Sequence, residues 1–168
     1  TDEEVIARCP WATTGRTHHR TPNIITSLEL DPAEMEKRNI HLQKKYAEIE
    51  ENEVRFEELH CEDAEYLIVA FGSCARIAQK AMEMAREEGI KVGLLRPITL
   101  WPFPLKAIAA RAAQVKGILT VELNAGQMVE DVRLAVECKV PVEHFGRLGG
   151  IVPDPDEVIT ALKEKLIK

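Results

Sequence analysis

The sequence has no long hydrophobic run, no excess of basic residues and no closely spaced pair of cysteines. Its longest apolar runs, such as residues 67–71, are far shorter than the roughly 20 residues that cross a bilayer. No charged and then apolar leader opens the chain. The net charge of −6 comes without a basic stripe of the kind that binds a phosphate backbone. We therefore expect a soluble protein with no nucleic-acid partner and no membrane partner.

The cysteines are too widely spaced to form the C-x-x-C pairs that bind zinc or an iron–sulfur cluster or act as a dithiol. There are four of them: Cys9, Cys61, Cys74 and Cys138. The His18–His19 and His60–Cys61 pairs have no second pair at a metal-binding spacing. We expect free thiols in a reducing cytoplasm, and no metal or other cofactor bound by this chain.

What the sequence does have is an uneven distribution of charge. Residues 29–65 carry 13 acidic and 5 basic residues, whereas residues 66–168 carry 12 acidic and 14 basic ones. The acidic part contains Asp31 and Pro32, a typical N-cap followed by a proline at the first helical position. A long charged helix with a narrow apolar stripe is predicted to follow. Its acidic surface is either solvated or a docking surface.

The chain length suits about one domain. We predict an arm or linker over residues 1–30, a linker helix and edge strand over 31–62, and an α/β domain over 63–168. Because the first residue is Thr1 rather than Met, we also expect the chain to be a piece of a longer protein.

From residue 66 onward, apolar runs of strand length alternate with segments whose apolar residues recur at helical spacing. The predicted strands are residues 66–71, 90–95, 118–123 and 140–145. This order predicts right-handed crossovers and a three-layer α/β/α fold, in which a mostly parallel sheet is covered on both faces. A half-exposed edge strand is expected at residues 54–58.

Ligands of open parallel sheets bind at the carboxyl ends of the strands, where helix N-termini and loops converge. The first such loop lacks the glycines of a dinucleotide fingerprint, the lysine of a P-loop and the glycine of a nucleophile elbow. We interpret its two leading residues as a tight turn and a helix cap. No residue is predicted to be catalytic. The candidate cleft or interface residues lie in the strand-end loops: Gly72, Ser73, Arg96, Glu122, Asn124, Gly126, Gln127 and Arg147.

Three of these features allow two interpretations each. The loop from Glu122 to Gln127 could dock a polar partner. Alternatively, Asn124 caps the following helix and the loop makes a domain contact. In both cases Glu122, a carboxylate at the end of an apolar strand, needs a partner. Arg147 lies in a glycine-rich turn and either allows close approach of another backbone or is solvated. Trp101 is more readily a hydrophobic plug beneath its proline-rich loop than a recognition surface.

The sequence resembles the second domain of the alpha subunit of 2-oxoacid:ferredoxin oxidoreductases at three motifs. These are R-P-I-T-L-W-P-F-P at 96–104, V-E-L-N-A-G-Q-M at 121–128 and G-R-L-G-G at 146–150. The branched-chain, 2-oxoisovalerate members are resembled further by P-N-I-I-T-S-L at 22–28 and by L-Q-K-K-Y-A-E-I-E-E-N-E-V-R-F-E-E at 42–58. The resemblance extends over nearly the whole chain from Thr13.

The resemblance implies a fold like that of the transketolase carboxy-terminal domain, a five-stranded sheet in the order 1-3-2-4-5 with strand 1 antiparallel. It implies an enzyme that decarboxylates a 2-oxoacid on thiamine diphosphate, passes two electrons through iron–sulfur clusters to ferredoxin and forms acyl-CoA. The implied partners are a preceding domain of the same subunit, beta, gamma and delta-type subunits, and ferredoxin. Thiamine diphosphate, Mg²⁺ and the clusters are implied for the whole complex and not for this chain.

The family motifs map onto Glu122, Asn124, Gly126, Gln127 and Arg147. The resemblance implies only that these residues face a neighbouring domain or the substrate-side cleft. This chain alone is then a scaffold and interface module. Two alternatives remain: an autonomous flavodoxin-like module that binds a nucleotide or flavin, and the matching domain of a 2-oxoacid dehydrogenase beta subunit.

Overall fold

A computed structural model of the chain describes Glu4 and residues 27–167. The chain divides into two compact units, Thr1–Gln43 and Lys44–Lys168. Most of the predicted arm, including Cys9 and the His18–His19 pair, lies outside the described residues. Within the part of the chain that the structure describes, no helix has both the length and the apolar character needed to cross a membrane.

Helix α2 (Pro32–Asn52) begins where the sequence predicts it. The Asp31 side chain accepts hydrogen bonds from the backbone N–H groups of Ala33 at 2.8 Å and Glu34 at 3.2 Å, which satisfies two of the free donors of the first turn. Every residue of α2 remains at least partly exposed to solvent. This exposure agrees with the predicted long helix, which is charged on most sides.

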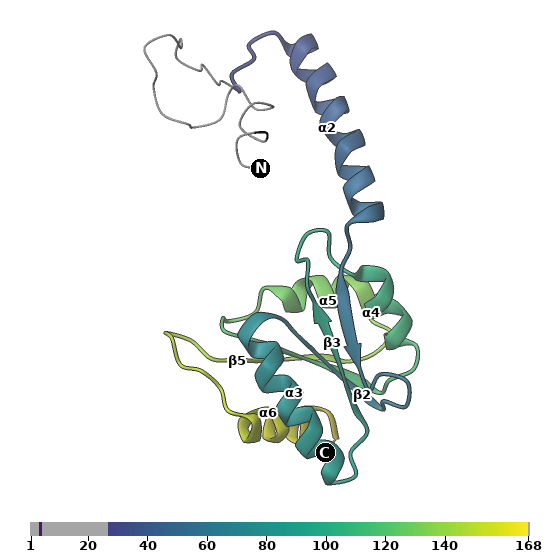
Figure 1. Cartoon of the computed structure of the whole chain (residues 1–168), viewed down its shortest axis with the longest axis vertical. Coiled ribbons are helices and arrows are strands. Elements are labelled where there is room, and N and C mark those ends of the chain that lie inside the picture. The colour runs from purple at the N-terminus through teal and green to yellow at the C-terminus, as the bar shows by residue number, and fades with distance from the viewer. Residues whose placement is uncertain (1–3, 5–26, 168) are drawn as a thin grey trace. The chain divides into compact units, whose positions relative to one another are not determined.

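The five strands are β1 (Phe56–Leu59), β2 (Tyr66–Ala70), β3 (Val92–Pro97), β4 (Gly117–Glu122) and β5 (Val142–Gly146). They form one sheet in the order β1-β3-β2-β4-β5. Figure 1 labels β2, β3 and β5 of this sheet. β1 runs antiparallel to β3, and the other neighbouring strands are parallel. The predicted fold class and the strand order that the family resemblance implies are both confirmed.

Three strands begin about two residues later than the sequence pattern indicates. Gly89 has a φ of +85°, and the Ile90 N–H donates to the Ala85 carbonyl, so Ile90 still belongs to the end of the preceding helix. Glu137 and Cys138 are left-handed and lengthen the turn before β5. The edge strand starts at Phe56 and not at Val54.

Helices cover both faces of the sheet, which explains the continuous apolar runs of the central strands. α3 (Gly72–Glu87) and α6 (Pro155–Leu162) pack on one face with alternate strand residues such as Ile68 and Leu119. α4 (Leu105–Ala112) and α5 (Met128–Val136) pack on the other with Leu67 and Ile118. A short π-helix, η1 (Lys163–Ile167), extends α6.

The last helix, α6, begins with a capping box. The Asp154 carboxylate accepts from the Glu157 N–H at 2.9 Å, and the Glu157 carboxylate accepts from the Asp154 N–H at 3.1 Å. Such a capping box satisfies two donors at once. It fixes the helix that closes one face of the sheet.

Candidate functional site

The carboxyl ends of β2 and β4 lie at the point where the winding of the sheet reverses. From the central strand β2 the chain moves to β3 on one side, while β4 and β5 lie on the other side. In open α/β sheets this reversal leaves a crevice where ligands and partners bind. The loops that begin at Phe71 and Leu123 border it. The predicted residues Gly72 and Ser73 directly follow Phe71, and Asn124, Gly126 and Gln127 lie in the second loop.

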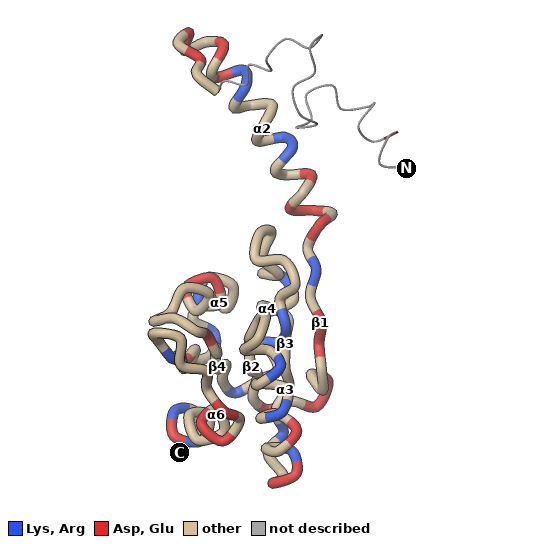
Figure 2. The backbone as a smooth tube through the Cα atoms, turned by 60° about the vertical axis from the view of Figure 1, so that its left-hand side comes forward, with Lys and Arg blue, Asp and Glu red and all other residues tan. Residues whose placement is uncertain are grey.

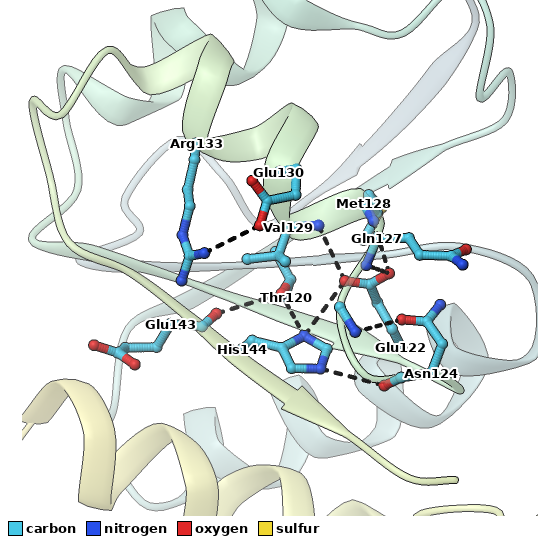
Figure 3. Close-up of polar contacts among 11 residues, drawn as sticks. Thr120, Glu122, Asn124, Gln127, Met128, Val129, Glu130, Arg133, Glu143 and His144 are labelled. Carbon is cyan, nitrogen blue, oxygen red and sulfur yellow. Dashed lines mark hydrogen bonds and ion pairs between the residues drawn. The ribbon is translucent and has the colours of Figure 1, made fainter. Parts of the chain in front are cut away.

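Glu122 is the organising residue of this edge. It is buried, with 1% of its surface exposed, and its carboxylate accepts the backbone N–H groups that open α5 (Figure 3). The distances are 3.2 Å from Gln127, 2.8 Å from Met128 and 3.0 Å from Val129. A carboxylate at a helix N-terminus is stabilised by these free donors and by the helix dipole. The end of β4 thereby holds the start of α5.

The prediction that Asn124 caps this helix is wrong. Its side-chain Oδ1 accepts from the Gly126 N–H at 2.7 Å and closes a turn within the loop. The physical reason is distance along the chain, because α5 begins only at Met128, and the Glu122 carboxylate already occupies its free donors. Asn124 therefore shapes the loop and not the helix.

His144 is the residue of this site that the sequence did not identify. Its Nδ1 lies 3.3 Å from Glu122 Oε1 and 3.2 Å from Thr120 Oγ1, and its Nε2 lies 3.3 Å from the Asn124 carbonyl oxygen (Figure 3). The register pairs Thr120 with His144, so both side chains stand on the same face of the sheet as Glu122. His144 ties β5 to the carboxylate and to the loop after β4.

Gly146 and Gly126 make this close packing possible. A Cβ atom on Gly146 would clash with the Asn124 carbonyl oxygen and lie 2.6 Å from His144 Nε2. Gly126 has a φ of +112°, which other residues rarely adopt. The predicted importance of Gly126 therefore has a conformational cause, whereas Gly146 gives room to the histidine.

At the other side of the crevice, the predicted tight turn at Gly72 is confirmed by a φ of +57°, but Ser73 does not cap α3. The N-cap position is Phe71, and no capping side chain is found there among the described residues. Ser73 lies within the first turn and is exposed. The thiol of the next residue, Cys74, is buried, and its pKa is raised by this burial and then by the Glu122 charge, so it is not an activated nucleophile.

The two predicted arginines are not drawn into the cluster around Glu122. Arg96 Nη1 lies 2.9 Å from Glu57 Oε2 across the β1–β3 pair. The Arg147 side chain contacts Glu157 at 3.3 Å, and its Nε is buried without a hydrogen-bond partner among the described residues. Only the backbone N–H of Arg147 reaches Glu122, at its carbonyl oxygen.

Trp101 is not the plug that the sequence predicted. Its side chain is 54% exposed and meets the Tyr46 ring edge-on at a centroid distance of 5.6 Å. The loop is anchored instead at Thr99, whose N–H donates to the Arg55 carbonyl and whose hydroxyl donates to the Pro102 carbonyl at 2.8 Å. This leaves Pro102 buried and turns the indole outward.

A small hollow of about 180 Å³ opens between the two loops. It is lined by Phe71, Glu122, Asn124, Gln127 and Asp131, among others. Ligand pockets for small molecules usually measure about 300–1,000 Å³. The hollow therefore suits a side chain of a neighbouring protein better than a nucleotide. Within the described residues, no group of three or more His, Cys, Asp or Glu side chains could hold a metal ion.

The polar groups of Glu122, Asn124 and His144 are used in internal hydrogen bonds, and the described residues bring no base next to Ser73.

Residues 64–158, more than half of the chain, match the family described as pyruvate:ferredoxin oxidoreductase core domain II. The chain belongs to this family.

Curated relatives extend the match beyond that domain. The ketoisovalerate oxidoreductase subunit VorB of Methanothermobacter thermautotrophicus is 45% identical over 165 residues, which are 96% of this chain and 46% of that subunit. The 2-oxoglutarate synthase subunit KorA of Methanothermobacter marburgensis is 33% identical over 101 residues, 60% of this chain and 27% of that subunit. This core domain II chain thus spans less than half the length of either relative.

The fold also matches a solved oxidoreductase. The structure of 2-oxoglutarate:ferredoxin oxidoreductase from Magnetococcus marinus, with 2-oxoglutarate, coenzyme A and succinyl-CoA bound, superposes with a TM-score of 0.69 and 26% sequence identity. The match covers 81% of this chain and 24% of that one. The relatives of this core domain II chain are therefore subunits of 2-oxoacid oxidoreductases, and the sequence-based family assignment is confirmed.

Proposed function

We propose that this chain is domain II of the alpha subunit of a 2-oxoacid:ferredoxin oxidoreductase whose substrate is 2-oxoisovalerate. The observation that carries the proposal is the 45% identity to a ketoisovalerate oxidoreductase subunit over 96% of the chain. The similarity to a 2-oxoglutarate synthase subunit is lower, 33% over 60% of the chain. The difference in coverage and identity favours the branched-chain substrate.

In the proposed complex the 2-oxoacid loses CO2, its acyl group passes to the thiol of coenzyme A, and two electrons reduce ferredoxin. Thiamine diphosphate supplies the centre on which decarboxylation takes place. The described residues do not fit Mg²⁺ or an iron–sulfur cluster, because no group of acidic, histidine or cysteine side chains among them is placed to bind a metal. We assign these groups to the beta, gamma and delta-type subunits and to the preceding domain of the alpha subunit.

The role proposed for residues 63–168 is that of a scaffold that presents the ends of β2 and β4 to that preceding domain or to the substrate-side cleft. Glu122 supports this role because its carboxylate accepts three backbone hydrogen bonds that fix the loop from Asn124 to Gln127. A loop fixed by a buried carboxylate offers a surface of constant shape. We place the complex in the cytoplasm, consistent with the three cysteines of the described residues, which are unpaired.

The test is a substrate comparison on the whole complex. The complex is purified through a tag on the subunit that contains this chain, and CoA-dependent reduction of ferredoxin is measured with 2-oxoisovalerate, pyruvate and 2-oxoglutarate. We expect the highest kcat/KM for 2-oxoisovalerate. A preference for either of the other two acids would contradict the substrate assignment, and acyl transfer to lipoamide without ferredoxin reduction would favour the dehydrogenase alternative.

A second measurement examines the chain alone. Calorimetric titration of the 168-residue chain with thiamine diphosphate and Mg²⁺ should give no binding heat, and the purified protein should be colourless. Tight cofactor binding would contradict the scaffold role. A yellow protein would favour the flavodoxin-like alternative.

A further inference from the structure

A second concave surface lies beside the edge strand β1. A groove of about 460 Å³ is bounded by the end of α2, by β1 and by the start of α4. Its large apolar lining residues, called its floor below, are Phe56, Phe103 and Leu105; α2 contributes Glu50 and Glu51 as an acidic wall, and α4 contributes Lys106. We call these six residues the β1 groove. All of them lie in the unit Lys44–Lys168.

Two large apolar side chains of the β1 groove are incompletely buried. Phe56 is 39% exposed and Leu105 is 40% exposed, although both border a concave surface in which a further side chain would remove them from water. Burial of apolar area is the main favourable term in protein association. The floor of the groove is therefore suited to one or two apolar side chains of a partner.

The acidic wall is electrostatically unsatisfied. Glu50 and Glu51 are exposed and have no ion-pair partner among the described residues, and the last turn of α2 contains no basic residue. The C-terminal end of a helix carries partial negative charge, so acids there are unfavourable and a cation is favoured. Figure 2 shows acidic residues, in red, where α2 passes into β1.

Two neighbouring acids of the same segment are paired. Glu53 lies 3.4 Å from Arg55, and Glu57 lies 2.9 Å from Arg96. Glu36, Glu48 and Glu62 lack an ion pair among the described residues, as do Glu50 and Glu51. Of these unpaired acids, Glu50 and Glu51 are the two that line the β1 groove.

We propose that the β1 groove binds a protein segment with one or two large apolar side chains flanked on one side by lysine or arginine. Charge complementarity fixes its orientation. The basic residues of the segment lie beside Glu50 and Glu51, and its apolar side chains contact Phe56 and Leu105, with no basic residue near Lys106. This inference is independent of the proposed oxidoreductase function.

The test uses the 168-residue chain and two synthetic 15-residue peptides with the same Leu and Phe residues. In one peptide these are flanked on one side by lysines, and in the other by glutamates. In ¹⁵N-labelled protein, the lysine peptide should shift the amide signals of residues 50–56 and 103–107, and its affinity should fall as salt is raised. The glutamate peptide should bind at least threefold more weakly. Equal binding of both peptides, or shifts elsewhere on the protein, would overturn the proposal.

Charge variants at the acidic wall and at Lys106 should not change the affinity for the lysine peptide in the same direction. The double variant E50K/E51K should weaken binding of the lysine peptide roughly three- to tenfold, as expected for exposed ion pairs, and K106E should leave it unchanged or strengthen it. E87K is the matched control, because Glu87 is exposed and unpaired among the described residues and lies at the far end of α3. If E87K weakened binding as much as the double variant, or if K106E did so, the effect would be one of net charge and the proposal would fail.

Apolar variants separate docking from self-association. L105Q should abolish the peptide-induced shifts, whereas L134Q, at a residue of α5 that is 69% exposed, should not. The amide spectrum of each variant without peptide shows whether it is folded. If the chain sediments as a dimer and L105Q makes it a monomer, a second copy occupies the groove and the proposal is overturned.

Discussion

Two carboxylates show how differently the carboxyl end of β4 and the edge strand β1 hold acidic residues. Glu122, at the end of β4, is buried, accepts hydrogen bonds from three backbone N–H groups and lies beside His144. Glu58, on the edge strand β1, keeps 23% of its side chain exposed and is neutralised by Arg111 through two contacts of 2.8 and 2.6 Å. One acid depends on the backbone of a loop, and the other depends on a single side chain.

This difference indicates different roles. The donors around Glu122 exist only while residues 124–129 keep one conformation, so the carboxylate and the loop stabilise each other. The Glu58–Arg111 pair, in contrast, joins two side chains. We infer that the contacts at the carboxyl end of β4 hold the following loop in a fixed shape. The Glu58–Arg111 pair on the edge strand β1 contributes only to stability.

Removing the buried carboxylate should have the largest effect on stability and tests whether Glu122 organises the loop after β4. Glu122→Ala leaves three buried N–H groups and His144 without their acceptor, and breaking a buried charged network costs about 3–5 kcal/mol. We expect the free energy of unfolding, measured by urea titration with circular dichroism, to fall by that amount. The Gly126 and Gln127 amide signals should shift or broaden as well.

The control for this variant is Glu143→Ala. Glu143 neighbours the same cluster on β5 and is half-buried, with no ion pair among the described residues. Its truncation should cost less than about 1 kcal/mol. If the two variants were equally stable, Glu122 would not be the residue that organises the edge.

The fold could be predicted because its signals are local and repeated. The run at residues 66–71 is too apolar for a half-exposed strand and too short for a helix, so it predicts a strand covered on both sides. The order of the strands, however, came from the family resemblance, since periodicity does not state which strands are neighbours. The start of β3 was misplaced because Ile90 continues the apolar pattern while its N–H completes a helix turn.

The site could be predicted only in part, for a related reason. The sequence indicated that Glu122 needs a partner, but three of its partners are backbone groups, which every residue has. The fourth, His144, is 22 positions away and is placed by the register of β4 and β5, which the hydrophobic pattern does not fix. Asn124 and Ser73 have good capping side chains, yet tertiary contacts decide which group reaches a helix end.

A second variant tests whether close packing around His144 matters as much as the carboxylate. Gly146→Ala puts a methyl group against the Asn124 carbonyl oxygen and the His144 ring. Overpacking of this kind costs about 1–3 kcal/mol, so we expect a loss near 2 kcal/mol in the same urea titration, with altered His144 ring signals in NMR spectra.

Gly149→Ala is the matched substitution for Gly146→Ala. Gly149 has a φ of +65°, but no atom of the described residues lies within 4 Å of its added Cβ. It should lose only about 1 kcal/mol, from backbone strain. A larger loss at Gly149 than at Gly146 would show that backbone conformation, and not the space beside the histidine, limits this edge.

The smallest effect is expected at the β1 edge, and it should depend on pH. The hydrogen bond from Arg111, followed by its charge, holds the pKa of Glu58 below the usual 4.5. A carboxyl whose pKa is lowered by folding stabilises the protein above the pKa of the unfolded chain, and this stabilisation is lost as the pH falls through the folded pKa. Glu58→Gln should therefore cost about 1 kcal/mol at pH 7, and urea titrations should show this cost shrinking below about pH 4.5.

Glu57→Gln makes the last distinction, because it removes the neighbouring but more exposed pair with Arg96. The two side chains of that pair are 51% and 43% exposed, and exposed ion pairs contribute about 0–1 kcal/mol. We expect a change below about 0.5 kcal/mol at pH 7. Equal losses for the Glu57 and Glu58 variants would mean that partial burial adds nothing to the Glu58–Arg111 pair. In that case Glu58 would behave like any exposed acidic residue, and only Glu122, which is bound by backbone N–H groups, would differ from them.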